Sequence, residues 1–245
     1  MAYVFLGEVP GLGNLSIFSV QNVSALLAVL FLVSSYVNWG VSKASKYLVV
    51  TFLTSYAIEY IGVTTGYPFG HYAYTSAMSP FIGPIPVFIP FEWCALGYFS
   101  LQATGISILA PAGLMALLDL SFDPIFSTSL WHWKSTVGPS YFGVPALNFI
   151  GWFIAAVIIF ALFWVVVRDR GARTKNSIVL SGGSAEAVGF YFLFGMSNIL
   201  PLVSGGMAEA GAVSTILFAI AAVLLWRWRS KGKESSFFEN RNDYR

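Results

Sequence analysis

Charged residues and cysteine are both scarce in this sequence. Only 10% of the 245 residues are charged, whereas a soluble domain has about 25%. Cys94 is the single cysteine, which excludes an internal disulfide and a cysteine-based metal site. Long apolar runs dominate instead, with 57% hydrophobic residues and a mean hydropathy of +0.73. These features predict an all-α, polytopic helix bundle that crosses the cell membrane several times.

The apolar runs predict about seven transmembrane spans in a single helical domain, residues 1–230, followed by a polar cytoplasmic tail, residues 231–245. The spans are expected at residues 17–37, 47–63, 90–109, 111–124, 145–167, 177–203 and 211–226. Lys and Arg mark cytoplasmic loops, and this arrangement leaves only Lys134 of the 13 Lys and Arg residues outside. We therefore expect the N-terminus outside the cell and the C-terminus in the cytoplasm.

Cations are missing from a long central stretch that nevertheless contains acids. No Lys or Arg occurs from Tyr47 to Trp133, yet this stretch holds Glu59, Glu92, Asp119 and Asp123. The two aspartates are four residues apart, a spacing that puts them on one face of a helix. Ionisable groups at membrane depth are costly and mark functional sites by default.

The predicted topology gathers these acids at the outer end of the bundle. Glu59, His71, Glu92, Asp123 and His132 lie toward that end, with Asp119 one helical turn deeper. A structural alternative is that the carboxylates cap helices or accept hydrogen bonds from aromatic and backbone donors. A metal site is a second alternative, but membrane di-iron enzymes need many more histidines than the two present. We predict no metal and no nucleic-acid partner.

Aromatic residues accompany the acids in sequence. They are Tyr67, Phe69, Tyr72, Tyr74, Trp131, Trp133 and Trp152. Part of this set is expected to form the interfacial belt of a membrane protein. An aromatic pocket around acids also suits an apolar substrate and a cationic intermediate, because ring faces attract positive charge.

Prolines interrupt the chain between the second and third predicted spans. Pro80, Pro84, Pro86 and Pro90 are incompatible with a regular helix interior over residues 80–90. This segment is expected to be extended or re-entrant. Pro90 is predicted as the first residue of the next helix, which puts Glu92 in its first turn, where the helix dipole favours a negative charge.

Two segments resemble signatures of a known family. The first is residues 59–74, Glu-Tyr-Ile-Gly-Val-Thr-Thr-Gly-Tyr-Pro-Phe-Gly-His-Tyr-Ala-Tyr. The second contains Asp119, Asp123-Pro124, Trp131-x-Trp133 and residues 141–152, Tyr-Phe-Gly-Val-Pro-Ala-Leu-Asn-Phe-Ile-Gly-Trp. Both look like the carotenoid biosynthesis membrane protein family, which contains the carotenoid 1,2-hydratases. The resemblance covers about residues 47–165.

The resemblance implies hydration of the terminal C1=C2 double bond of an acyclic carotenoid end, without a cofactor. An acid protonates the alkene, and water adds to the tertiary carbocation to give a tertiary alcohol. Asp119 or Asp123 is the expected acid, with Glu59 or Glu92 as its partner. Substrate or water binding is expected of His71, Tyr72, Tyr74, Trp131, Trp133, Asn148 and Trp152. The partners are then the carotenoid, water and membrane lipid, and the oligomeric state stays open.

Two other functions remain open at this level. Pro90-Phe91-Glu92 is similar to a motif of the small membrane lycopene beta-cyclases, but Trp93 stands where that motif has a second acid. A cyclase begins with the same protonation and ends by proton loss. A non-catalytic lipid carrier or transporter also accommodates buried acids and a proline-broken segment.

Overall fold

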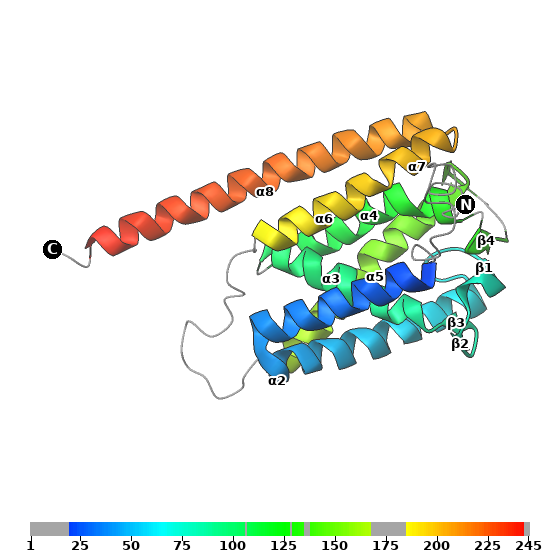
Figure 1. The fold of residues 1–245 in the computed structure, drawn as a ribbon, viewed down its shortest axis with the longest axis horizontal. Coiled ribbons are helices and arrows are strands. Elements are labelled where there is room, and N and C mark those ends of the chain that lie inside the picture. Colours follow the sequence, from blue (N-terminus) through cyan, green and yellow to red (C-terminus); the bar gives the residue numbers. More distant parts are fainter. Residues whose placement is uncertain (1–19, 106, 128, 135–137, 168–184, 243–245) are drawn as a thin grey trace, which may run out of the picture.

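A computed structural model describes residues 20–105, 107–127, 129–134, 138–167 and 185–242 (Figure 1). It is mostly helical. The helices are α2 (Val20–Thr65), α3 (Phe88–Thr104), α4 (Leu109–Phe126), α5 (Ala146–Val167), α6 (Ala185–Ser197), α7 (Ile199–Ser204) and α8 (Ala208–Asn242). Residues 17–19 of the first predicted span and 177–184 of the sixth lie outside the described residues.

Helix α2 is a hairpin of two arms that meet at Gly40. Gly40 has φ 74° and ψ 164°, a conformation that glycine adopts without steric cost. The arms, residues 20–39 and 41–65, run antiparallel (Figure 1). Tyr36 Oη and Ser45 Oγ are 3.1 Å apart, and the Phe31 and Tyr47 ring centroids are 5.8 Å apart. The first two predicted spans therefore pack against each other.

Helix α3 occupies the centre of the bundle, and its side chains are buried from Ile89 to Thr104 with few exceptions. Its observed limits correct two predictions. The helix begins at Phe88 rather than Pro90, so Glu92 lies in its second turn. It ends at Thr104 rather than residue 109, because Gly105 takes φ 79° and stops the helix.

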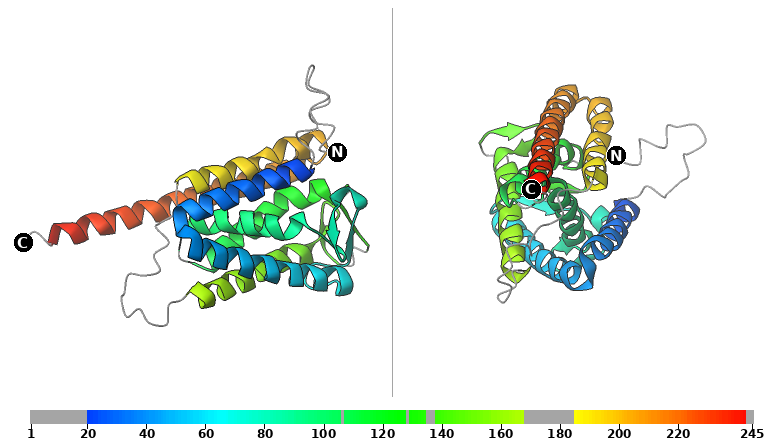
Figure 2. Two further views of the ribbon diagram at one scale, coloured as in Figure 1. Left: turned by 60° about the horizontal axis from the view of Figure 1, so that its bottom comes forward. Right: turned by 90° about the vertical axis from the view of Figure 1, so that its left-hand side faces the viewer.

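The remaining helices alternate in direction around α3 (Figure 2). Helix α4 continues two residues past the predicted end at Pro124, which lies inside its last turn. Helix α8 continues to Asn242, through most of the predicted polar tail. Within the described residues, 5 helices are long and apolar enough to cross a membrane, with α2 counted as one and α6 and α7 joined. This finding indicates a membrane protein.

All the strands lie at one end of the bundle (Figure 1). Four of them form two short hairpins. In the first, β2 (Phe81–Ile82) pairs with β3 (Ile85–Pro86), and in the second, β5 (Ser140–Tyr141) pairs with β6 (Val144–Pro145). The first is the extended segment that the prolines predict. The strands β1 (Tyr72–Tyr74) and β4 (Trp131–Trp133) pair antiparallel, with Ala73 opposite His132. These strands fall in segments that were predicted as irregular loops.

Candidate active site

The β1–β4 pair closes the end of the bundle with aromatic side chains. Side chains alternate between the two faces of a strand, so Tyr72 and Tyr74 share one face with Trp131 and Trp133. All four line a cavity within the bundle. His132, on the other face, is exposed to solvent. The sequences Tyr-Ala-Tyr and Trp-His-Trp thus build one aromatic wall from two segments far apart in the chain.

Asp119 and Asp123 face this cavity from α4. Their four-residue spacing puts both on one side of the helix, as predicted, and they are 0% and 2% exposed. Asn148, from the first turn of α5, donates from Nδ2 to Oδ2 of each aspartate at 2.6 Å. Trp131 Nε1 donates to Oδ1 of Asp123 at 2.6 Å. Asp123 therefore has a donor on each oxygen, whereas Asp119 has one on Oδ2.

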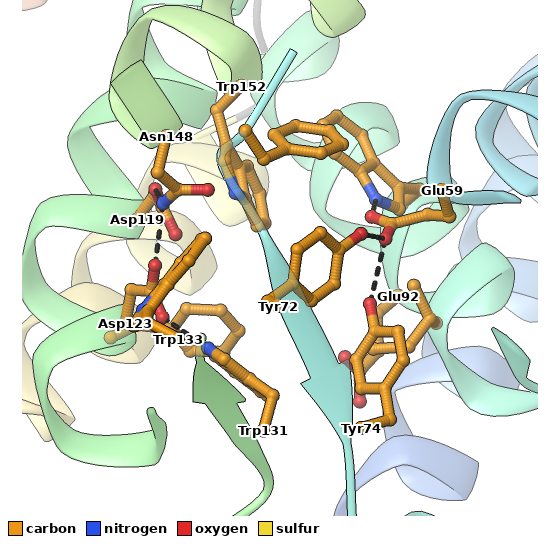
Figure 3. A pocket seen from close by; sticks show the side chains of 14 residues that line it. Glu59, Tyr72, Tyr74, Glu92, Asp119, Asp123, Trp131, Trp133, Asn148 and Trp152 are labelled. Carbon is orange, nitrogen blue, oxygen red and sulfur yellow. Dashed lines mark hydrogen bonds between the residues drawn. The ribbon is translucent and has the colours of Figure 1, made fainter. Parts of the chain in front are cut away.

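Glu59 lies across the cavity from the aspartates, near the end of α2 (Figure 3). Its Oε2 accepts hydrogen bonds from Tyr72 Oη at 2.5 Å and from Tyr74 Oη at 2.8 Å. Its Oε1 accepts one from Trp93 Nε1 at 2.9 Å. Burial and the nearby carboxylate raise the pKa of both tyrosines well above the usual value. Both phenols are thus neutral donors that hold Glu59 as an acceptor.

Glu92 differs from the other acids in its surroundings. It projects from α3, and its Oε1 accepts a hydrogen bond from Ser24 Oγ on the first arm of α2. Glu92 lines the aromatic cavity described above and also a second, neighbouring cavity. It is therefore placed at the boundary between the two spaces.

The first cavity, here called the acid cavity, has a volume of about 40 Å³ (Figure 3). Its lining residues are Glu59, Phe69, Tyr72, Tyr74, Ile89, Glu92, Trp93, Asp119, Phe122, Asp123, Trp131, Trp133, Asn148 and Trp152. A water molecule needs roughly 10–15 Å³ measured in this way. The acid cavity therefore has room for water.

Two polar atoms that line the acid cavity lack partners within the described ranges. They are Asp119 Oδ1 and Trp133 Nε1. Buried polar groups are nearly always hydrogen-bonded to protein or to water. One of these atoms accepts a hydrogen bond and the other donates one, so water in the acid cavity is a suitable partner for each.

The second cavity, here called the apolar cavity, has a volume of about 180 Å³. Its lining residues are Val23, Ser24, Leu27, Met78, Glu92, Leu96, Phe122, Phe126, Leu130, Trp131, Phe194, Ser197 and Asn198. It shares Glu92, Phe122 and Trp131 with the acid cavity. A polar chamber and a larger apolar chamber thus meet at one carboxyl group and two aromatic rings.

The structure brings together all four predicted catalytic acids and six of the seven predicted binding residues. His71 is the exception, because it is exposed and does not line the acid cavity. It lies over Gly66, where an added Cβ atom would be 2.8 Å from the imidazole. The structure thus does not bring His71 into the acid cavity with the others, and its expected role in substrate or water binding stays a prediction.

Sequence reasoning missed three contributors to the site. Trp93 binds Glu59 and stacks on Trp152 with ring centroids 4.5 Å apart. Ser24 binds Glu92 from α2, and Phe122 lies between the two cavities. The position of Trp93 next to Glu92 was a usable signal, whereas nothing in the sequence near Ser24 marks it.

Apolar helices closed at one end around carboxyl groups and aromatic rings define a helical membrane protein with a buried acid site. The chain belongs to the carotenoid biosynthesis protein family, whose pattern matches residues 17–221. The match includes every residue of the acid cavity.

One curated relative is the bisanhydrobacterioruberin hydratase of Haloarcula japonica. The two sequences are 29% identical over 146 residues, which is 54% of this chain and 49% of the relative. The chain thus spans about half the length of that relative. No solved structure matches the chain.

Proposed function

We propose that this protein is a carotenoid 1,2-hydratase that adds water to the terminal C1=C2 double bond of an acyclic carotenoid end. The observation that carries the proposal is the junction of two cavities at Glu92. Hydration of an isoprenoid alkene needs an apolar seat for the alkene, a proton donor beside it and a source of water. The apolar cavity, Glu92 and the acid cavity supply these three components.

Glu92 is the proton donor in this proposal. It is the carboxyl group that borders both cavities, and an alkene in the apolar cavity meets it first. In the described part of the chain Glu92 accepts one hydrogen bond, from Ser24, so its other oxygen is free to carry a proton. The O–H bond of Glu92 breaks as a C–H bond forms at C2, which leaves a tertiary carbocation at C1.

Asp119 is the proposed base for water. A water in the acid cavity donates to Asp119 Oδ1 and accepts from Trp133 Nε1, two buried atoms of the cavity-lining residues that otherwise lack partners in the described ranges. The water oxygen bonds to C1 as its proton passes to Asp119. That proton returns to Glu92 through water in the cavity. The net reaction adds one water and consumes no acid, so no redox cofactor is required.

This division reverses the one expected from the sequence, in which an aspartate was the acid. The reason is geometric, because neither aspartate lines the apolar cavity. Asp123 and Glu59 act instead as fixed hydrogen-bond acceptors, since donors occupy both oxygens of each. Their oxygen dipoles stabilise the carbocation, as do the ring faces of Phe122 and Trp131.

The proposal extends to topology. Counting both arms of α2, then α3, α4, α5, the α6–α7 pair and α8 gives seven crossings of the cell membrane. The acid site then lies toward the outside, with the N-terminus outside and the C-terminus in the cytoplasm. The distribution of Lys and Arg supports this orientation.

The proposed activity is tested by expressing the protein in cells that make an acyclic carotenoid and analysing the pigments by mass. A gain of one water per reacted end supports hydration. An isomer of unchanged mass with a ring shows a cyclase instead. If every acyclic carotenoid tried is left unaltered, both the hydratase and the cyclase proposals are contradicted and a carrier function is favoured.

A further inference from the structure

The apolar cavity has a defined shape. Its floor is formed by α3 and α4, through Leu96 and Phe126. One wall is the first arm of α2, through Val23 and Leu27, and the opposite wall is α6, through Phe194. The cavity therefore lies among four helices, and the space between the first arm of α2 and α6 is here called the groove.

The two walls are neighbours on one side of the bundle. Figure 2 shows the first arm of α2, in dark blue, beside α6, in yellow. On α2, Leu26 is 58% exposed and Leu27 is 6% exposed. On α6, Leu193 is 75% exposed and Phe194 lines the cavity. Each wall thus has an apolar outer surface directly beside the groove, which suits a route open to lipid.

The size of the groove limits what it holds. A cavity of about 150 Å³ in another protein binds benzene, which has six carbons. The apolar cavity measures about 180 Å³, so it has room for about one five-carbon isoprene unit. The rest of a carotenoid has to remain outside, and lipid is the apolar medium next to the groove.

We infer that the groove between the first arm of α2 and α6 admits an isoprenoid chain sideways from the bilayer and seats its terminal unit against Glu92. This inference rests on the proposed function for the identity of the chain. The occupant is the acyclic end of the substrate, because the groove borders the acid cavity at Glu92, Phe122 and Trp131. The polyene extends from the groove into lipid.

Leu26 and Leu27 provide a matched pair for the test. Leu27→Trp fills the groove, whereas Leu26→Trp puts the same side chain on the exposed face of the same helix. Each substitution is made in the Asp119→Asn background, and we measure lycopene retained by the protein purified in detergent. Leu27→Trp is expected to lower retention about tenfold or more, as a misfit in an apolar pocket does. Leu26→Trp is expected to retain as much as the background.

Equal retention by the two variants, whether high or low, overturns the inference. If Leu27→Trp does not fold, Leu27→Ala replaces it. With active enzyme that variant is expected to raise KM and leave kcat unchanged, and an unchanged KM overturns the inference. The proposed function fails by a different result. If Leu27→Trp loses lycopene retention but the unmodified protein never hydrates lycopene, the inference about the groove stands and the proposed hydratase activity is wrong.

Discussion

Asp119 and Asp123 accept hydrogen bonds from the same nitrogen, Nδ2 of Asn148, each at 2.6 Å. One amide from α5 thus fixes two acids on α4. Two carboxyl groups this close repel each other when both are ionised. The shared donor offsets part of that repulsion and sets the direction in which the remaining oxygen of Asp119 faces.

Replacing Asn148 with leucine is expected to reduce hydration and stability together. Asn148→Leu leaves both Oδ2 atoms without their donor, at a cost of about 1–3 kcal/mol for each buried group left unpaired. The thermal midpoint in detergent and the rate of water addition are measured. Asn38→Leu is the control, because Asn38 is exposed and donates to Ser34 and Tyr98 away from the acid cavity. A rate unchanged by Asn148→Leu contradicts the assigned role.

The division between Glu92 and Asp119 is tested in deuterated water. Glu92→Gln is expected to abolish both deuterium incorporation into the substrate end and water addition, because no acid remains to protonate the alkene. Asp119→Asn is expected to abolish water addition while deuterium still enters the end group, since a carbocation that is not captured loses a proton again. The opposite pattern, with exchange only in Glu92→Gln, would reassign the acid to Asp119.

Removing either phenol donor to Glu59 is expected to lower the free energy of unfolding. Tyr72→Phe and Tyr74→Phe each remove one hydrogen bond to Glu59 Oε2, and each is expected to cost about 1–3 kcal/mol. Tyr56→Phe is the control, because Tyr56 bonds the carbonyl of Ile82 outside the cavity. Thermal midpoints are compared. A control that loses as much as the two cavity variants contradicts the proposed support of Glu59.

The proposed orientation is tested with single cysteines at exposed lysines. Cys94 is buried, so it does not compete for a membrane-impermeant thiol reagent. Lys134→Cys is expected to react in intact cells, because Lys134 is exposed at the end that holds the strands. Lys46 is exposed at the opposite end, so Lys46→Cys is expected to react only after the cells are lysed. The reverse labelling pattern would show that the protein has the opposite orientation in the membrane.

The sequence predicted much of this arrangement because its signals are local. Hydropathy indicated the helices, and a spacing of four residues indicated that Asp119 and Asp123 share a helix face. Helix limits were less accurate, since Gly105 ended α3 earlier than the apolar run suggested. Glycine at such a position is a local signal that the prediction did not use.

Contacts between distant segments were beyond local patterns. The pairing of Tyr72 with Trp133 joins strands about 60 residues apart, and no periodicity specifies that register. The hydrogen bond from Ser24 to Glu92 also joins segments that are far apart in the chain. His71 shows the converse, because a residue inside a recognisable signature lies at the surface. Membership of the signature segment did not imply a position at the cavity.

The protein is proposed to add water to an isoprenoid alkene at the junction of its two cavities. The most direct measurement uses the purified protein, an acyclic carotenoid in lipid vesicles and water enriched in heavy oxygen, followed by mass analysis of the pigment. The expected product is a tertiary alcohol that contains the heavy oxygen, and Glu92→Gln is expected to form none. Unaltered carotenoid, or a product without the heavy oxygen, would contradict it.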